Sequence, residues 1–287
     1  MIEQTKLRKE SNWAKRLCAI VTSIFCGCFF ILGALQGGAA YRKAENGHWT
    51  PAYAKVDITP LLLKGERTEE EYATLYAQTG LTKLGVDGLL ERGEIVRILN
   101  IQDAYFNEYT ITTKSFAPYT YTRKIDGEAE FALLEDGDIF ISGSAFTSWF
   151  QYGHSGIVVD GEKEMVLDSV TIGYDSAVST IRSFKRHARF MILRPKADEK
   201  TRRAVAKYAL ENLKGKPYDV AVGLLSPKAA EEVKGTHCSH LVWYAYHQFG
   251  IDLDSSGGAI VTPRDLANAT ELELVQTFGF HPQTLWN

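Results

Sequence analysis

The chain has 287 residues, of which 45% are hydrophobic, 23% charged and 11% aromatic, and its formal net charge is −3. This composition excludes a wholly disordered chain, a collagen-like repeat and a membrane protein with many spans. Residues 41–287 contain 27 basic and 33 acidic residues, a net charge of −6, and an acidic body does not attract phosphate backbones, so we expect no nucleic-acid partner.

An apolar segment without charges runs from Leu17 to Leu35 and follows a basic cluster near the N-terminus. A helix that crosses a bilayer needs about 20 apolar residues, whereas the apolar core of a signal peptide needs only about 7–15. We therefore expect residues 1–40 to form a cytoplasmic basic segment and a single retained span. Because Lys and Arg precede the span, the body is expected outside the cytoplasm. Gly38 and Ala40 offer a small-residue cleavage site, so secretion after signal cleavage is the alternative.

Residues 41–130 are predicted to form a helical accessory region, which could act as a lid, a spacer or an inhibitor. The spacing in Thr68–Glu71 is that of a capping box, and it predicts the start of a helix that Gly80 can end. A second helical pattern covers residues 82–106. Residues 105–121 are rich in Tyr, Phe and Thr and are expected to be extended chain or loop.

From Leu133 onwards the period of the hydrophobic pattern changes, and residues 131–287 are predicted to form one further domain. The expected strands are residues 138–141, 153–159, 164–169 and 189–193, the middle two joined by a hairpin turn at Asp160-Gly161. The expected helices are residues 200–213 and 238–249, the second ended by Gly250. Strands followed by helices predict an α+β domain in which an antiparallel sheet packs on the second helix.

Cys238 is the only cysteine of the body, since the other three lie in the apolar segment. The body therefore has no partner for an internal disulfide and no cysteine pair for zinc. Cys238 begins an apolar stripe with Leu241, Val242, Ala245 and Phe249, which places the thiol at the N-terminus of a helix. Unpaired N–H groups there favour a thiolate and can bind an oxyanion. A small core residue that happens to begin a helix is the alternative interpretation.

A thiolate nucleophile needs a general base, and His154 is the best candidate because it begins an apolar strand. If the hairpin loop has three residues, Asp168 lies directly opposite His154, where a carboxylate orients the imidazole and stabilises its charged form. Loops of two or four residues would place Leu167 or Ser169 there instead. Asp175 is a second candidate for the acid. The remaining histidines have simpler explanations. His187 lies among basic residues and is expected on a solvated face, and His247 is expected at an exposed helix position. His237 and His240 flank Cys238, His48 follows the apolar segment, and His281 lies in the C-terminal tail.

Four segments together resemble the circularly permuted papain-like cysteine hydrolases of the NlpC-like superfamily, in which the histidine strand precedes the cysteine helix. They lie within residues 133–275, at 134–140 (LEDGDIF), 153–159 (GHSGIVV) with 166–169 (VLDS), 215–219 (GKPYD), and 237–242 (HCSHLV) with 244–246, 250–253 and 262–266 (TPRDL). The resemblance implies a permuted papain-like fold, with Cys238 as nucleophile and His154 as general base and acid.

The same resemblance assigns the third catalytic position to Asp168, where the family often has Glu or another polar residue. Tyr218 resembles the aromatic residue that lies near the nucleophile, and Tyr152 and Ser239 are further expected substrate contacts. His237 and His240 depart from the more usual aromatic and acidic or small neighbours of the cysteine, and His237 is expected to alter local pKa values or the fit of the substrate.

These expectations describe a membrane-tethered cysteine amidase or peptidase that acts outside the cytoplasm through an acyl-enzyme, without a metal or cofactor. Its substrate would be a peptide or isopeptide amide, with a cell-wall peptide of peptidoglycan as the substrate that the location suggests. One alternative is a lipid-directed thioesterase or acyltransferase, because a tether would hold the thiol near acyl chains. The other is a catalytically silent binding module on a membrane stalk.

Overall fold

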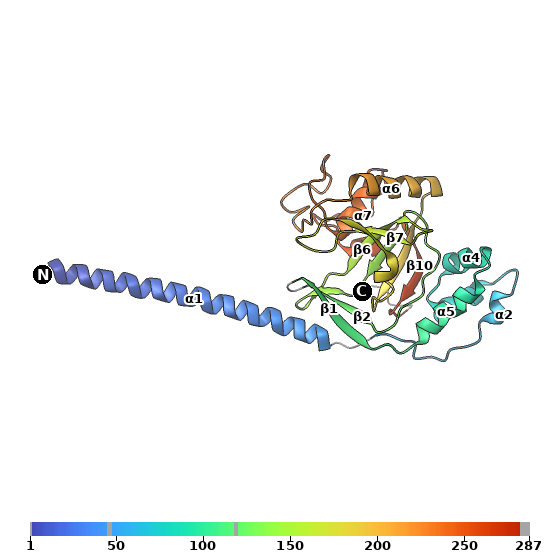
Figure 1. Cartoon of the computed structure of the whole chain (residues 1–287), viewed down its shortest axis with the longest axis horizontal. Coiled ribbons are helices and arrows are strands. Elements are labelled where there is room, and N and C mark those ends of the chain that lie inside the picture. The colour runs from blue at the N-terminus through green and yellow to red at the C-terminus, as the bar shows by residue number, and fades with distance from the viewer. Residues whose placement is uncertain (1, 45–47, 118–119, 282–287) are drawn as a thin grey trace. The chain divides into compact units, whose positions relative to one another are not determined.

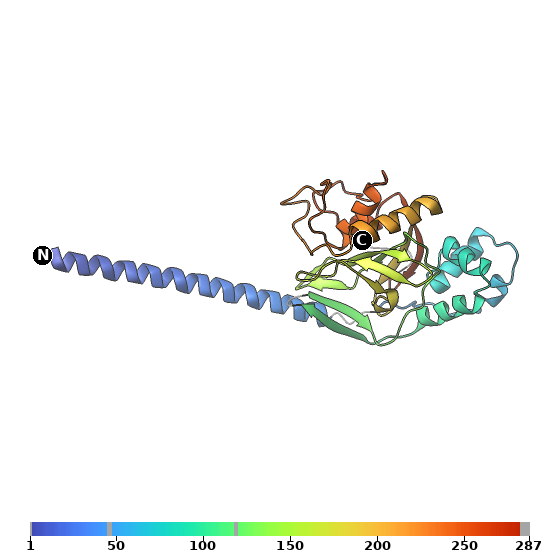
Figure 2. The ribbon, with the colours of Figure 1, turned by 45° about the horizontal axis from the view of Figure 1, so that its top comes forward.

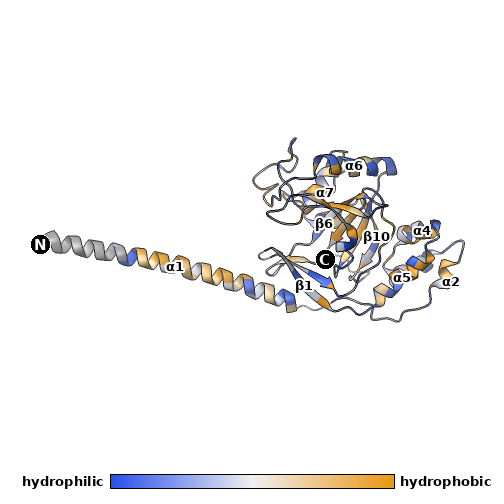
Figure 3. Ribbon diagram, in the orientation of Figure 1, coloured by the Kyte–Doolittle hydropathy of each residue, from blue (hydrophilic) through white to orange (hydrophobic). Residues whose placement is uncertain are grey.

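The computed structural model describes residues 2–44, 48–117 and 120–281, so the last six residues of the expected C-terminal domain lie outside the described part. The chain divides into two compact units, residues 1–45 with 148–150, and residues 46–147 with 151–287. The first is dominated by helix α1 (Ile2–Ala44). A window of 18 residues within its segment Lys15–Ala44 has a mean hydropathy of 2.4, so the helix is long and apolar enough to cross a membrane, a property that signal sequences share (Figure 3).

The accessory region contains four helices, α2 (Thr59–Leu62), α3 (Glu69–Thr79), α4 (Lys83–Glu91) and α5 (Ile95–Phe106). The capping box at Thr68 is confirmed, and Gly80 ends α3 in the left-handed conformation with φ 72°. The pattern predicted as one helix over residues 82–106 forms two helices. The chain turns between them at Gly93, whose φ of 73° is incompatible with a continuous right-handed helix.

The described residues form two antiparallel sheets. The smaller has the strand order β1-β2-β4-β5. The larger has six strands in the order β10-β9-β3-β6-β7-β8 (Figure 1). The strands are β1 (Ile111–Ala117), β2 (Thr120–Ile125), β3 (Ile139–Ser142), β4 (Ala145–Thr147), β5 (Phe150–Gln151), β6 (His154–Asp160), β7 (Met165–Asp168), β8 (Ala177–Thr180), β9 (Phe190–Pro195) and β10 (Leu272–Phe278).

The large sheet has a hydrophobic cluster on each face, because alternate strand residues point in opposite directions. Ile139, Ile157 and Leu167 belong to the cluster that contains α6 (Glu199–Asn212) and α7 (Cys238–His247). Phe140 and Val158 belong to the cluster that contains the accessory helices. Figures 1 and 2 show α6 and α7 together on one face of this sheet. The mixed α+β architecture with antiparallel sheets and an apolar N-terminal helix is therefore as predicted.

Helix α7 is more deeply buried than its sequence predicts. Every residue from Cys238 to Tyr246 is buried, so this part of the helix has no solvent-exposed face. Phe249, which we expected on the apolar stripe, lies beyond the end of α7, is 38% exposed and contacts the ring of Tyr208. The stripe is incomplete because α7 ends at His247, two residues before Phe249.

A buried ion pair fixes the start of β3, the strand next to β6. The carboxylate of Asp138 accepts hydrogen bonds from Nε and Nη2 of Arg194, both at 2.8 Å, and from the N–H of Glu135 at 2.9 Å. Asp138 is fully buried, so these bonds replace the water that its charge would otherwise require. Its function is therefore to hold the strands β3 and β9 and the turn before them.

Candidate active site

Cys238 begins α7, as the sequence predicts, and is 6% exposed. The preceding residue, His237, has an extended backbone and caps the helix, because its Nδ1 accepts a hydrogen bond from the N–H of His240 at 3.4 Å. The sulfur therefore lies at the helix end where backbone N–H groups are unpaired and the helix dipole is positive.

His154 is the first residue of β6, and it follows a sharp turn at Gly153, whose φ is 78°. Its ring stacks on Phe184, with a centroid distance of 5.7 Å and an interplanar angle of 6°. Its Nε2 lies 2.8 Å from Oδ2 of Asp168. Since this nitrogen donates to the carboxylate, Nδ1 is the ring nitrogen that remains for an interaction with Cys238, which is one of the groups that raise the pKa of His154.

The predicted strand register that led to Asp168 is wrong by two residues. Asp168 pairs with Gly156 rather than with His154, because the loop between β6 and β7 has four residues and a bulge follows Val158. A shift of two keeps both side chains on the same face, so the carboxylate reaches the imidazole diagonally. Gly156 leaves room for this contact, since a Cβ there would lie 3.2 Å from Cβ of Asp168 and 2.6 Å from Cγ1 of Val166.

Cys238 and His154 favour the charged form of each other. Burial by itself raises the pKa of the thiol, but hydrogen bonds with His154 and His237 and their charges lower that pKa well below its ordinary value. Burial likewise opposes the charged imidazole, whereas Asp168 and the thiolate raise the pKa of His154 above its ordinary value. Each group therefore favours the charged form of the other, a thiolate beside an imidazolium.

His237 is the site residue that the sequence analysis understated. Its Nδ1 is an acceptor, so in the neutral ring Nε2 carries the hydrogen. Within the part of the chain that the structure describes, this buried Nε2 has no nitrogen or oxygen partner. His237 is also one of the residues that lower the pKa of the Cys238 thiol, through a hydrogen bond and its charge. Flanking residues on a helix normally diverge, but His237 precedes the helix and has an extended backbone, so this argument from helix geometry does not apply to it.

The three expected substrate contacts have different environments. Tyr218 and Tyr152 are half-buried, and burial is the main cause that raises the pKa of each phenol, with the charge of Cys238 as a further cause. Tyr218 also forms a β-bridge with Thr236, two residues before Cys238. Ser239 is 1% exposed and its hydroxyl donates to the carbonyl of Val261 at 2.8 Å. We therefore correct the expectation for Ser239, which anchors α7 to the following loop and is inaccessible to substrate.

Two other expectations change. His187, expected on a solvated face, is 5% exposed, and burial lowers its pKa well below the ordinary value. Its Nδ1 contacts Oγ of Ser142 at 2.7 Å, because the segment after β8 folds over the end of β3. Asp175, the alternative acid, is exposed and forms a bridge with Pro217, away from the position that Asp168 occupies.

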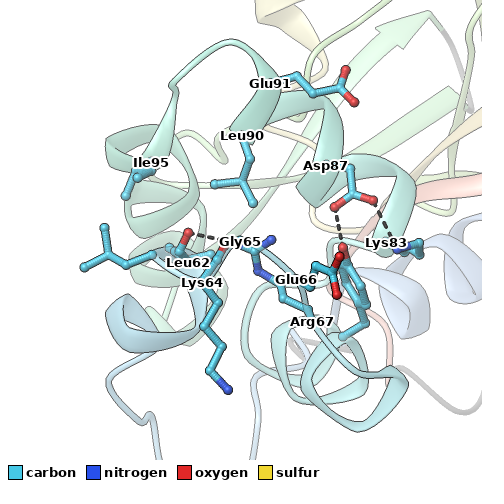
Figure 4. Close-up of a pocket in the computed structure, with 12 residues that line it drawn as sticks. Leu62, Lys64, Gly65, Glu66, Arg67, Lys83, Asp87, Leu90, Glu91 and Ile95 are labelled. Atoms are coloured by element: carbon cyan, nitrogen blue, oxygen red, sulfur yellow. Dashed lines mark hydrogen bonds and ion pairs between the residues drawn. The ribbon is translucent and has the colours of Figure 1, made fainter.

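The structure also has a pocket of about 700 Å³ in the accessory region, which none of the predicted site residues lines (Figure 4). Its polar groups are largely paired within its own wall. Asp87 accepts from Tyr72 at 2.6 Å and contacts Lys83 at 3.3 Å, and Arg67 donates to the backbone carbonyl of Leu61 at 2.8 Å. Among the described residues, no group of three or more His, Cys, Asp or Glu is arranged to hold a metal ion.

Comparison with known proteins gives a limited result. No protein-family model matches the chain, and no solved structure matches it significantly. The chain is similar to the uncharacterized protein YycO of Bacillus subtilis (strain 168), with 26% identity over 153 residues. The match covers 53% of this chain and 59% of that relative, so it spans little more than half of either protein.

Proposed function

We propose that this chain is a membrane-tethered cysteine hydrolase that cleaves an amide bond through an acyl-enzyme. The observation that carries the proposal is the convergence of Cys238, His154 and Asp168, which lie far apart in the sequence. The 2.8 Å contact between His154 and Asp168, together with a thiol at a helix N-terminus, matches the requirements of a nucleophile, a base and an orienting acid.

In the proposed mechanism, the thiolate of Cys238 attacks the carbonyl carbon of the amide. Negative charge moves from the sulfur to the carbonyl oxygen, where the N–H of Cys238 and Nε2–H of His237 stabilise it. The imidazolium of His154 then protonates the leaving amine, and the C–N bond breaks to give a thioester. His154 removes a proton from water, which attacks the thioester and releases the acid and the thiol.

The proposed fold is the permuted papain-like one, because the strand of His154 precedes the helix of Cys238 in the chain. The proposed location is outside the cytoplasm, with α1 as the membrane anchor, since basic residues precede its apolar segment. A peptide or isopeptide amide of the cell wall is the substrate class that this location favours, with Tyr218 and Tyr152 beside the scissile bond.

The proposal can be tested with the full-length protein in detergent. Peptidoglycan-derived peptides and acyl lipids are offered separately, and mass spectrometry identifies any acyl group attached to Cys238. We expect a peptidyl adduct and release of a free amine by the wild type and by Cys26→Ala, the matched control in α1, and neither by Cys238→Ala. Undiminished amine release by Cys238→Ala would refute the mechanism, and an adduct derived only from acyl lipids would refute the substrate class.

A further inference from the structure

Two loops beside the candidate active site expose apolar side chains to solvent. One follows Asp168 at the end of β7, and the other lies between α6 and α7, directly before Cys238. The exposed fractions reach 67% at Ile172 and 88% at Leu225. We call the six exposed apolar residues of these loops the apolar rim: Val170, Ile172, Tyr174, Val220, Leu224 and Leu225.

Backbone hydrogen bonds join the two loops, so the rim is one feature of the surface although its parts are distant in sequence. The N–H of Ser176 donates to the carbonyl of Lys216 at 2.8 Å, and the N–H of Tyr218 donates to the carbonyl of Tyr174 at 3.2 Å. Tyr218 forms a β-bridge with Thr236, two residues before Cys238, and the N–H of Thr236 donates to the carbonyl of Pro217 at 3.0 Å. The rim therefore borders the candidate active site.

The most exposed part of the rim is held in a defined turn. The N–H groups of Leu224 and Leu225 both donate to the carbonyl of Ala221, at 2.9 and 2.8 Å, and the N–H of Gly223 donates to Ser226 at 2.8 Å. The φ of Gly223 is 92°, and a Cβ there would lie 1.9 Å from the carbonyl oxygen of Ala259. The turn thus presents two adjacent leucines to solvent, and clustered exposed apolar residues of this kind mark an interaction site.

The chain itself indicates what covers the rim. Its N-terminal helix is long and apolar enough to cross a membrane, and a covalently linked body stays at a high local concentration near that membrane. The anchor alone does not decide which surface of the body faces the lipid. We infer that the apolar rim inserts into the surface of the bilayer, and thereby directs the candidate active site towards the lipid interface.

The inference is tested with the full-length protein reconstituted in phosphatidylcholine and phosphatidylglycerol vesicles. All four native cysteines are replaced by alanine, and Leu225→Cys is labelled with an environment-sensitive fluorophore. Lys207→Cys provides the control, because the Lys207 side chain is 73% exposed and lies in α6, outside the rim. The test needs no catalytic activity, so its outcome is independent of the proposed hydrolase function.

We expect a blue-shifted emission from position 225, and a loss of intensity when the vesicles contain nitroxide-labelled lipids, with neither effect at position 207. Emission from position 225 that resembles the control would overturn the inference. A blue shift that nitroxide lipids do not quench would also overturn it, because the rim would then be covered by protein, such as a second copy of the chain.

Discussion

Replacing Asp168 by Asn removes the charge that faces His154 but keeps the size of the side chain. The Asp168 side chain is 8% exposed and lies 2.8 Å from Nε2, so water screens the pair little. A hydrogen bond to a charged group contributes about 1.5–3 kcal/mol. Since one pKa unit corresponds to about 1.4 kcal/mol, the pKa of His154 should fall by roughly one to two units in Asp168→Asn.

The sign of the effect on stability follows from the direction of the shift. Burial disfavours the imidazolium, but Asp168 and Cys238 raise the pKa of His154 from 6.5 to about 10. The contribution of the charged His154 ring to folding stability is therefore complete below pH 6.5, and it is lost as the pH rises through about 10. In Asp168→Asn this loss should be complete at a lower pH, and the total contribution should be smaller.

The assay is an NMR titration of the His154 ring in isotopically labelled full-length protein in detergent micelles. The matched control is Asp175→Asn, because Asp175 is an exposed acid in the loop that follows β7. We expect a lowered pKa in Asp168→Asn and an unchanged pKa in the control. An unchanged titration in Asp168→Asn, or an equal shift in both variants, would refute the assignment of Asp168 as the partner of the imidazole.

Three further predictions concern other parts of the site and its support. If Nε2–H of His237 stabilises the oxyanion, His237→Ala should lower kcat by roughly 10²–10³-fold. His237→Gln keeps an N–H donor, so its kcat should fall less. Equal kcat values in both variants and the wild type would argue against this role. Gly156→Ala should displace the facing carboxylate, so the His154 titration should shift in the direction seen for Asp168→Asn, and a wild-type titration would contradict the steric argument. Asp138→Ala should reduce the free energy of unfolding by about 1.5–3 kcal/mol in urea denaturation, because it removes the buried carboxylate that accepts from Nε and Nη2 of Arg194 and leaves Glu135 as the acid that pairs with this guanidinium. The exposed Glu199→Ala should change the free energy of unfolding by less than about 0.5 kcal/mol. Similar values for the two variants would be inconsistent with a buried ion pair.

Much of the local structure was predictable because its signals are carried by adjacent residues. The capping box at Thr68 and the left-handed glycine at Gly80 each occur where the sequence places them. The thiol at the start of α7 and the histidine at the start of β6 were predictable for the same reason. In each case the polar or conformational requirement is met within a few residues of the chain.

The strand register was less predictable because it depends on the conformation of the hairpin loop. Glu164 adopts a φ of 50°, and the N–H of Lys163 donates to the side chain of Asp160 at 2.9 Å. These interactions stabilise a four-residue loop that the Asp160-Gly161 signal does not specify. The contact between His154 and Asp168 was nevertheless predicted, because an error of two residues preserves the face of each side chain.

The buried histidines could not be located from the sequence. The ring of His187 contacts Ser142 and Phe184. In His240, Nδ1 lies 2.9 Å from the hydroxyl of Thr236 and Nε2 lies 2.9 Å from the carbonyl oxygen of Lys228. Burial lowers the pKa of His240 to about 4, so it is a neutral structural residue. Such roles depend on contacts between segments that are distant in sequence.

The most direct test of the account is the ionisation state of Cys238 itself. The ultraviolet absorbance of the thiolate is measured against pH in the full-length protein, and the spectrum of Cys238→Ala is subtracted to remove the other cysteines. We expect a difference signal that is fully present at neutral pH and persists into the acidic range, because His154 and His237 lower the pKa of the thiol. A signal that appears only near the ordinary value of 9.0 would contradict the proposed thiolate–imidazolium pair.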